Sequence, residues 1–167
     1  MVGAVAPSTR FLGEAMLENI DFDNTKIIVE LGPGNGVFTD IIVQRMAPDA
    51  KLLVFELNEE FYNSLNEKYN DPRVQVIHDS AEFISKYLEE GQKADCIISS
   101  LPLMVFPEML RLRVISASQN ALKKGGKYVQ FQYSLQSKKL LERAFKNVSV
   151  RFTIKNFPPA FVYTCSK

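Results

Sequence analysis

The residues best suited to chemistry lie in Glu30–Gly36, where an acidic side chain precedes three glycines at alternate positions. The segment follows the apolar run Ile27–Val29 and precedes the helix-like stretch Val37–Val43. Glycines allow a positive φ and leave no side chain between backbone and ligand, so a strand that turns into a helix around them forms a nucleotide cradle. The dinucleotide pattern does not fit, because its third glycine is missing at the usual offset. Glu30 would repel a pyrophosphate, which predicts a ligand that carries a positive charge.

Polar residues also follow three further strand-like runs. Glu56 stands 26 positions after Glu30, near the offset of about 20 residues expected of an acid that binds ribose hydroxyls. Each strand end by itself is also an ordinary strand-to-helix cap. Four in succession predict a ligand site at the carboxyl edge of a parallel sheet. The three runs, each with the residues that follow it, are 51–55 with Glu56, 74–77 with His78-Asp79-Ser80-Ala81, and 94–98 with Ser99-Ser100-Leu101-Pro102-Leu103.

The elements that position these residues alternate along the chain, without a linker, an internal repeat or a break in composition. This alternation predicts one domain over residues 1–167, an α/β fold with a Rossmann-like, doubly wound, seven-stranded sheet. The sheet should be mostly parallel, with a reversed C-terminal edge strand from a closing hairpin. Helices are expected at 9–19, 39–46, 59–69, 81–89, 107–122 and 137–146, and the later strands at 128–133, 148–155 and 160–165, with a turn at 123–126.

Composition sets limits on partners and location. A net charge of +1 argues against a dedicated nucleic-acid binder, which usually has a basic face. The two cysteines, Cys96 and Cys165, lie in apolar runs without metal-ligand spacing, so we expect buried thiols and no metal site. No run of about 18 apolar residues exists for a membrane span, and the N-terminal residues do not form a signal peptide. These features favour a cytoplasmic protein.

The glycine turn with its acid resembles the first motif of class I S-adenosylmethionine (SAM)-dependent methyltransferases, whose cofactor carries an amino group and a sulfonium. More specifically, the chain resembles the bacterial phospholipid N-methyltransferases over nearly its whole length. The ribosomal RNA adenine dimethylases are a related branch with a similar core and glycine turn. The segments that carry the resemblance to the phospholipid enzymes are Gly3–Leu12, Ile97–Leu103, Tyr128–Tyr133 and Asn156–Ala160.

The resemblance implies methyl transfer from SAM, with S-adenosylhomocysteine as product, to the amine of phosphatidylethanolamine or a related aminolipid. The partners would be the aminophospholipid substrate and, peripherally, the inner face of the membrane. The implied cofactor contacts are Ser8, Thr9 and Arg10 at the carboxylate, Glu30 at the ammonium, Gly32, Gly34 and Gly36 at the methionyl part, Glu56 at the ribose, and Leu57, Asp79, Ser80 and Ala81 at the adenine, with Ser99 beside them. The implied acceptor contacts are Ser99, Ser100 and Leu101, with Tyr133 as a further candidate.

Alternatives remain at this stage. In the adenine dimethylases an amide and an aromatic residue hold a flipped base, whereas here Ser100 and Leu103 stand at those positions. Leu103 cannot stack on a base but could line a lipid channel. Methylation of ribosomal RNA or of a small molecule, and a non-catalytic SAM-binding module, stay open. His78 is either a base or a structural strand-end residue, and the basic residues Arg111, Arg113, Lys123 and Lys124 either meet a lipid phosphate or lie on a solvated surface.

Overall fold

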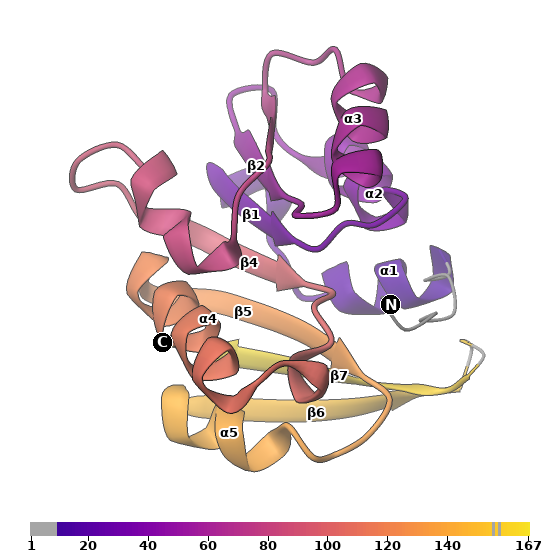
Figure 1. Ribbon diagram of the computed structural model, residues 1–167, viewed down its shortest axis with the longest axis vertical. Coiled ribbons are helices and arrows are strands. Elements are labelled where there is room, and N and C mark those ends of the chain that lie inside the picture. The colour runs from indigo at the N-terminus through magenta and orange to yellow at the C-terminus, as the bar shows by residue number, and fades with distance from the viewer. Residues whose placement is uncertain (1–9, 155, 157) are drawn as a thin grey trace.

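The computed structural model describes residues 10–154, 156 and 158–167. The chain forms one seven-stranded sheet with helices on both faces (Figure 1). The strand order is β3-β2-β1-β4-β5-β7-β6, in which β7 runs antiparallel to both of its neighbours. The strands are β1 (Ile27–Leu31), β2 (Lys51–Phe55), β3 (Val74–Ile77), β4 (Ala94–Ser99), β5 (Leu122–Gln132), β6 (Asn147–Thr153) and β7 (Ala160–Ser166).

The helices cover the sheet from two sides. Helices α1 and α2 pack on one face, and η2, α4 and α5 pack on the other. Helix α3 lies beside α2 (Figure 1), and the hydroxyl of Tyr69 at its end donates to Asp40 Oδ1 at 2.7 Å. The helices are α1 (Arg10–Leu17), α2 (Val37–Arg45), α3 (Glu59–Lys68), α4 (Glu108–Ala121) and α5 (Lys138–Ala144), with 3₁₀ turns η1 (Phe22–Asn24), η2 (Ala81–Tyr87) and η3 (Leu103–Val105).

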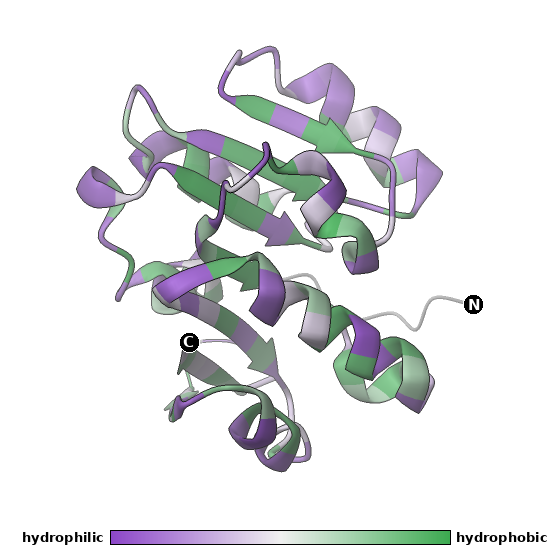
Figure 2. Ribbon diagram, turned by 90° about the vertical axis from the view of Figure 1, so that its left-hand side faces the viewer, coloured by the Kyte–Doolittle hydropathy of each residue, from purple (hydrophilic) through white to green (hydrophobic). Residues whose placement is uncertain are grey.

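Alternating side chains along the central strands divide the apolar core in two. In β1, Ile27, Val29 and Leu31 face α4 and η2, whereas Ile28 faces α1 and α2. All five residues of β1 are buried, as expected of a parallel strand covered on both faces. The central strands are accordingly the most hydrophobic part of the ribbon in Figure 2. Glu30 follows the same alternation and therefore points toward α2.

The predicted architecture is confirmed, including the closing hairpin and the reversed C-terminal strand. That strand, β7, inserts between β5 and β6, so β6 is the outermost strand of the sheet. The parallel crossovers place the carboxyl ends of β1 to β4 at one edge, where β1 is flanked by β2 and β4. Ligands bind at such a switch point in open α/β sheets.

Two local predictions differ from the structure. The helix expected at 81–89 is the 3₁₀ segment η2, which is interrupted by non-helical dihedral angles at Phe83. The turn expected at 123–126 lies within β5 as an irregularity, because pairing with β4 shifts from Leu122 to Lys127. Gly125, at φ +76°, provides the left-handed residue that this excursion needs. Across the described ranges, no helix is both long and apolar enough to cross a membrane.

Candidate active site

The glycine turn lies at the carboxyl end of β1, and its shape is set by left-handed backbone. Gly32, Gly34 and Gly36 have φ values of 68°, 57° and 82°. The Gly32 amide donates to the Phe55 carbonyl at 2.9 Å, and a Cβ at Gly32 would lie 2.7 Å from Leu101 Cδ2. A Cβ at Gly34 would meet no atom within 4 Å. The turn therefore touches the loop after β4 at Gly32 and borders open space at Gly34.

Glu30 lies below this turn and is fully buried. Thr39 Oγ1 donates to Glu30 Oε2 at 2.7 Å, whereas Oε1 has no hydrogen-bond partner among the described residues. Burial raises the pKa of Glu30 to about 8; the Thr39 hydrogen bond opposes this, and the charges of Asp40 and Glu56 add to it. A buried carboxyl oxygen without a partner is costly. Such an oxygen suits a cationic ligand group in direct or water-mediated contact.

Glu56 lies at the carboxyl end of β2, opposite the glycine turn. Its Oε2 accepts from the Gly34 amide at 3.2 Å and its Oε1 from the Asn58 amide at 2.8 Å. An ionised carboxylate offers about four lone-pair sites, so two further hydroxyl donors can be accepted. Leu57 follows Glu56 in the chain, and 64% of its surface is exposed, which leaves an apolar side chain free to pack on the ring of a base. The arrangement fits a ribose at Glu56 and a base at Leu57.

His78 supports the loop after β2. Its Nε2 lies 3.0 Å from the Leu57 carbonyl oxygen, and the ring of Tyr62 stacks on it at 4.8 Å. The structure therefore favours the structural strand-end interpretation of His78 over a role as base.

The residues after β3 form a hydrogen-bonded corner. Asp79 Oδ2 accepts from the Tyr87 hydroxyl at 2.7 Å, and Oδ1 accepts from the Ser80 amide at 2.8 Å. The Tyr87 hydrogen bond, together with that amide and Lys86, lowers the pKa of Asp79. Ser80 caps η2 through Oγ, and Ala81 is buried. Asp79 is thus held as a carboxylate, which can accept from an exocyclic amino group.

The loop 99–103 follows β4 and faces the glycine turn. The Ser100 amide donates to the Leu31 carbonyl at 2.9 Å, and Ser99 Oγ accepts from the Leu101 amide at 3.3 Å. The Leu101 carbonyl accepts three hydrogen bonds, from the Leu103 amide and from two glutamine side chains of β5. Within the described part of the chain, the Ser100 hydroxyl and carbonyl have no hydrogen-bond partner. Ser100 is therefore the residue of this loop whose acceptors remain available.

The expectation for Leu103 changes, whereas that for Tyr133 stays open. Leu103 is fully buried in the core on the α4 side, so it does not line an open lipid channel. Tyr133 packs edge-on against Phe131 at 5.6 Å on the opposite face of the sheet. Burial raises the pKa of Tyr133, and the nearby Asn156 side chain opposes this shift. A contact between Tyr133 and the acceptor stays a prediction.

The cationic candidates have local partners. Arg10 pairs with Glu14 one turn along α1, at 3.7 Å, and its contact to a cofactor carboxylate stays a prediction. Ser8 and Thr9 lie outside the described residues. Arg113 pairs with Glu82 and Lys123 with Asp95, which favours the solvated-surface interpretation of these two.

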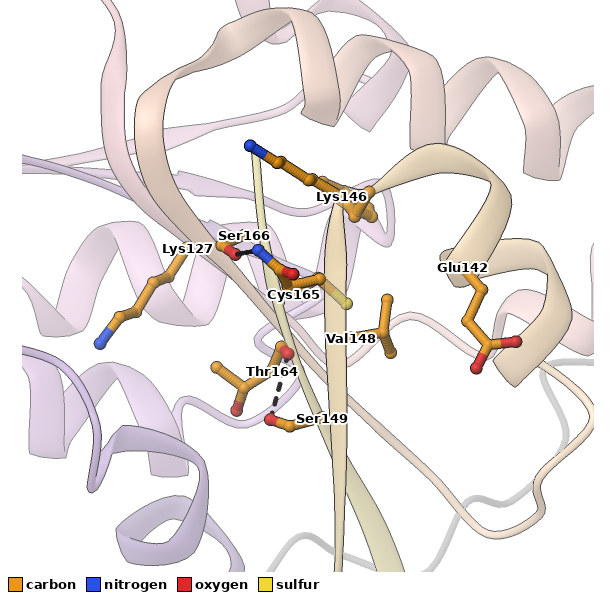
Figure 3. A pocket seen from close by; sticks show the side chains of 10 residues that line it. Lys127, Glu142, Lys146, Val148, Ser149, Thr164, Cys165 and Ser166 are labelled. Carbon is orange, nitrogen blue, oxygen red and sulfur yellow. Dashed lines mark hydrogen bonds between the residues drawn. The ribbon is translucent and has the colours of Figure 1, made fainter.

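A separate hollow lies between α5 and the strands β6 and β7 (Figure 3). Ser149 Oγ donates to the Thr164 carbonyl at 3.3 Å, and Asn147 Nδ2 donates to Ser166 Oγ at 3.3 Å. Cys165 also lines it, and burial raises the pKa of that thiol to about 12. Lys127 of β5 also lines the hollow. It lies opposite Ser166 in the register of β5 and β7, and its Nζ donates to the Asn19 carbonyl. These residues include none of the four strand ends that form the candidate site.

Sequence reasoning did not identify the side chains that hold these loops in place. Gln130 and Gln132 on β5 bind the Leu101 carbonyl, and Tyr69 donates to the Gly36 carbonyl at 3.2 Å. A signal for the glutamines was present, because Tyr128, Gln130 and Gln132 alternate with the apolar residues Val129 and Phe131. Polar side chains on one face of a buried strand need partners, and the loop after β4 provides them.

Comparison with known proteins agrees with this geometry. A family model described as methyltransferase small domain matches residues 4–158. The ornithine lipid N-methyltransferase of Singulisphaera acidiphila is 28% identical over 168 residues, which span 98% of this chain and 88% of that protein. The ribosomal RNA small subunit methyltransferase A of Borreliella burgdorferi is 29% identical over 98 residues, which span 58% of this chain and 33% of that protein.

The solved structure of the T. thermophilus 16S rRNA N2 G1207 methyltransferase with AdoMet and guanosine has a TM-score of 0.74 against this chain at 18% identity. The match covers 100% of this chain and 45% of that one, so it shows a shared fold. Our chain thus spans less than half the length of these two ribosomal RNA methyltransferases.

Proposed function

We propose that this chain, which belongs to the methyltransferase small domain family and is an SAM-dependent methyltransferase, methylates the amine of phosphatidylethanolamine or a related aminolipid. The observation that carries the proposal is the extent of the match to a lipid enzyme. The ornithine lipid N-methyltransferase aligns with 98% of the chain, whereas the ribosomal RNA methyltransferase A aligns with 58%. The sequence supports it further, because position 103 carries leucine and not an aromatic residue that could stack on a base.

The cofactor half of the site, which consists of Glu30, the glycine turn 32–36, Glu56 and the residues after β3, fits SAM in three places. The open space at Gly34 admits a ligand against the backbone, the unpartnered oxygen of Glu30 suits an ammonium, and Glu56 has capacity for ribose hydroxyls. Leu57 would pack on the adenine, with Asp79, Ser80 and Ala81 at its edge, and Ser99 lies at the same strand-end cluster. When bound, SAM would supply an electrophilic methyl group.

The acceptor half of the site, which is the loop 99–103, orients an amine. The Ser100 carbonyl and hydroxyl can each accept one N–H, which directs the nitrogen lone pair toward the cofactor half. No ionisable side chain lies within the loop 99–103. An alkylamine has a pKa of about 10.4 by analogy with lysine, and desolvation near the buried Ser99 lowers the pKa of the bound amine. The amine therefore loses its proton to solvent as it binds, and the rate should rise with pH.

A lipid substrate also needs a surface for the bilayer, and we place this surface on η3 and the start of α4. Val105 is 78% exposed and Met109 65% exposed, and Leu112 is exposed one turn further along α4. These residues follow the loop 99–103 directly in the chain. An amine held at Ser100 therefore leaves its acyl chains next to them. Exposed apolar side chains beside an active site are suited to contact with a membrane.

The test is a methyl-transfer assay with labelled SAM. Vesicles that contain phosphatidylethanolamine or ornithine lipid are compared with phosphatidylcholine vesicles, with total RNA and with a vesicle-free control. We expect label in the extracted aminolipid. Label in RNA alone would refute the lipid acceptor, and SAM binding without transfer to any amine would favour the non-catalytic module.

The surface is tested separately with Val105→Ser/Met109→Ser. Vesicle sedimentation should lose bound protein, while SAM affinity stays unchanged. The control is Leu135→Ser, which removes an apolar residue after β5 that is 50% exposed. Equal binding of both variants to vesicles would place the membrane contact elsewhere.

A further inference from the structure

The Leu101 carbonyl oxygen is held by more donors than a loop carbonyl normally has. The Leu103 amide donates to it at 2.8 Å across Pro102, whose φ of −77° and ψ of 72° are those of an inverse γ-turn. Gln130 Nε2 donates to the same oxygen at 2.9 Å and Gln132 Nε2 at 3.0 Å. A carbonyl oxygen has two lone pairs. It therefore has no capacity left for a substrate N–H.

The two glutamines reach this oxygen because of the sheet register. Gln130 pairs with Ser99 across β4 and β5, and Gln132 is two residues further on the same face. Gln130 is fully buried, and its second amide hydrogen goes to the Phe131 carbonyl at 2.8 Å. Its Oε1 accepts from the Tyr128 hydroxyl at 2.7 Å. An amide with every group satisfied in a buried network has a single orientation.

Ser100 is held on both sides by these contacts. On its N-terminal side its own amide binds the Leu31 carbonyl, which ties it to β1. On its C-terminal side the loop is tied through the Leu101 carbonyl to β5. The Ser100 hydroxyl and carbonyl remain without partners within the described residues. The loop is thus fixed at the Ser100 amide and at the Leu101 carbonyl, one on each side of the Ser100 hydroxyl and carbonyl that can accept an amine.

We propose that Gln130 and Gln132 are positioning residues that hold the Leu101 carbonyl and thereby present Ser100 as the hydrogen-bond acceptor for the substrate amine. This inference rests on the proposed methyl transfer to an amine. In-line transfer depends on alignment, and a displacement of about 1 Å can cost about 100-fold in rate. The glutamines act on the rate through this alignment and not through the cofactor.

The test variant is Gln132→Met, which keeps the side-chain length and removes one donor to the Leu101 carbonyl. Gln130→Met would also orphan the buried Tyr128 hydroxyl, so it is the second variant. The matched control is Gln119→Met. Gln119 lies on α4, and its side-chain amide also donates to a backbone carbonyl, that of Ala144 on α5. For each protein we would measure kcat and KM for the acceptor, SAM affinity, the melting temperature and amide hydrogen exchange.

We expect Gln132→Met to lower kcat by about 10- to 100-fold, with SAM affinity within about twofold of wild type. The Leu103 and Val105 amides, which bind the Leu101 and Pro102 carbonyls, should exchange faster. Gln119→Met should keep kcat and this exchange unchanged. An unchanged kcat in Gln132→Met would overturn the proposal, and so would a parallel loss of SAM affinity, which would indicate general distortion.

The wild-type assay separates this proposal from the proposed function. If wild type labels RNA instead of lipid, the lipid acceptor is refuted, and the kcat of Gln132→Met is measured on RNA. If wild type labels no acceptor, amide hydrogen exchange at Leu103 and Val105 decides whether the glutamines hold the loop. Unchanged exchange in Gln132→Met would then overturn the holding role, and faster exchange would support it.

Discussion

The two halves of the site, the glycine turn 32–36 and the loop 99–103, are held in different ways. The turn takes its shape from its own backbone, with three glycines at positive φ and open space at Gly34. The loop has no positive φ, since all such residues in the described chain are glycines outside it. Its shape instead comes from hydrogen bonds that β5 supplies to the Leu101 carbonyl.

This difference separates the part of the site that serves a common cofactor from the part that serves a particular acceptor. A turn built from glycine backbone can hold the same cofactor in many proteins, whatever surrounds it. A loop held by side chains of a neighbouring strand depends on that strand, so it can change with the acceptor. The two halves meet where Gly32 packs against Leu101.

The largest effect is expected from Gly32→Ala, which strains the turn and pushes on the loop. A left-handed alanine costs about 1–2 kcal/mol, and the new Cβ would lie 2.7 Å from Leu101 Cδ2. We expect the free energy of unfolding to fall by about 3 kcal/mol, with loss of SAM binding and of transfer. Gly91→Ala is the matched control, because Gly91 has φ +75° and no neighbour within 4 Å of a Cβ. Urea unfolding that gives equal losses for both variants would refute the close contact.

Glu56→Ala tests the cofactor half alone. Removing a charged acceptor of ribose hydroxyls should weaken SAM binding by about 100-fold, since hydrogen bonds to charged groups contribute about 1.5–3 kcal/mol each. Isothermal titration calorimetry gives the affinity, with the exposed Glu59→Ala on α3 as control. An unchanged SAM affinity would show that Glu56 does not hold the ribose.

Glu30→Gln tests the buried Glu30 carboxyl through the pH dependence of the free energy of unfolding. In the fold the pKa of Glu30 is about 8, against 4.5 for an ordinary glutamate. Between these values the folded protein binds the extra proton, so the free energy of unfolding should fall as pH rises, by roughly 1.4 kcal/mol per pH unit. Glu30→Gln carries no charge at any pH and should remove this slope from SAM-free protein. Glu82→Gln, which replaces a glutamate of lowered pKa, should retain the slope; a wild type without a slope would contradict the assignment.

Ser100→Ala should give the smallest effect, because the backbone carbonyl of residue 100 remains. We expect kcat/KM for the acceptor to fall by about 10-fold, the equivalent of one neutral hydrogen bond of about 1.4 kcal/mol, with SAM affinity unchanged. Ser116→Ala, on the exposed face of α4, is the control. Steady-state kinetics that show a fall in SAM affinity instead would move Ser100 to the cofactor half.

The glycine turn and the strand ends beside it could be predicted from the sequence for a physical reason. Glycine at positions 32, 34 and 36 encodes left-handed backbone directly, and Glu30 and Glu56 follow apolar strands whose ends must share one edge. The roles of the individual site residues remain predictions.

The acceptor half was less predictable, because it depends on contacts between distant residues. That Gln130 meets Leu101 depends on the pairing of Gln130 with Ser99, which only the assembled sheet determines. The burial of Leu103 and the 3₁₀ form of η2 likewise depend on packing around α4. Local residue types do not encode these features.

The insertion of β7 between β5 and β6 has a consequence for the order of folding. During synthesis β6 leaves the ribosome before β7, yet β7 is its one partner strand in the sheet and also the strand that covers the open edge of β5. The open edge of β5 must therefore wait for the residues that follow it up to Ser166, roughly two to seven seconds at about 5–20 residues per second. Unpaired strand edges recruit other chains. We therefore expect a nascent chain of this protein to be most open to such pairing in the interval between the synthesis of β5 and that of β7.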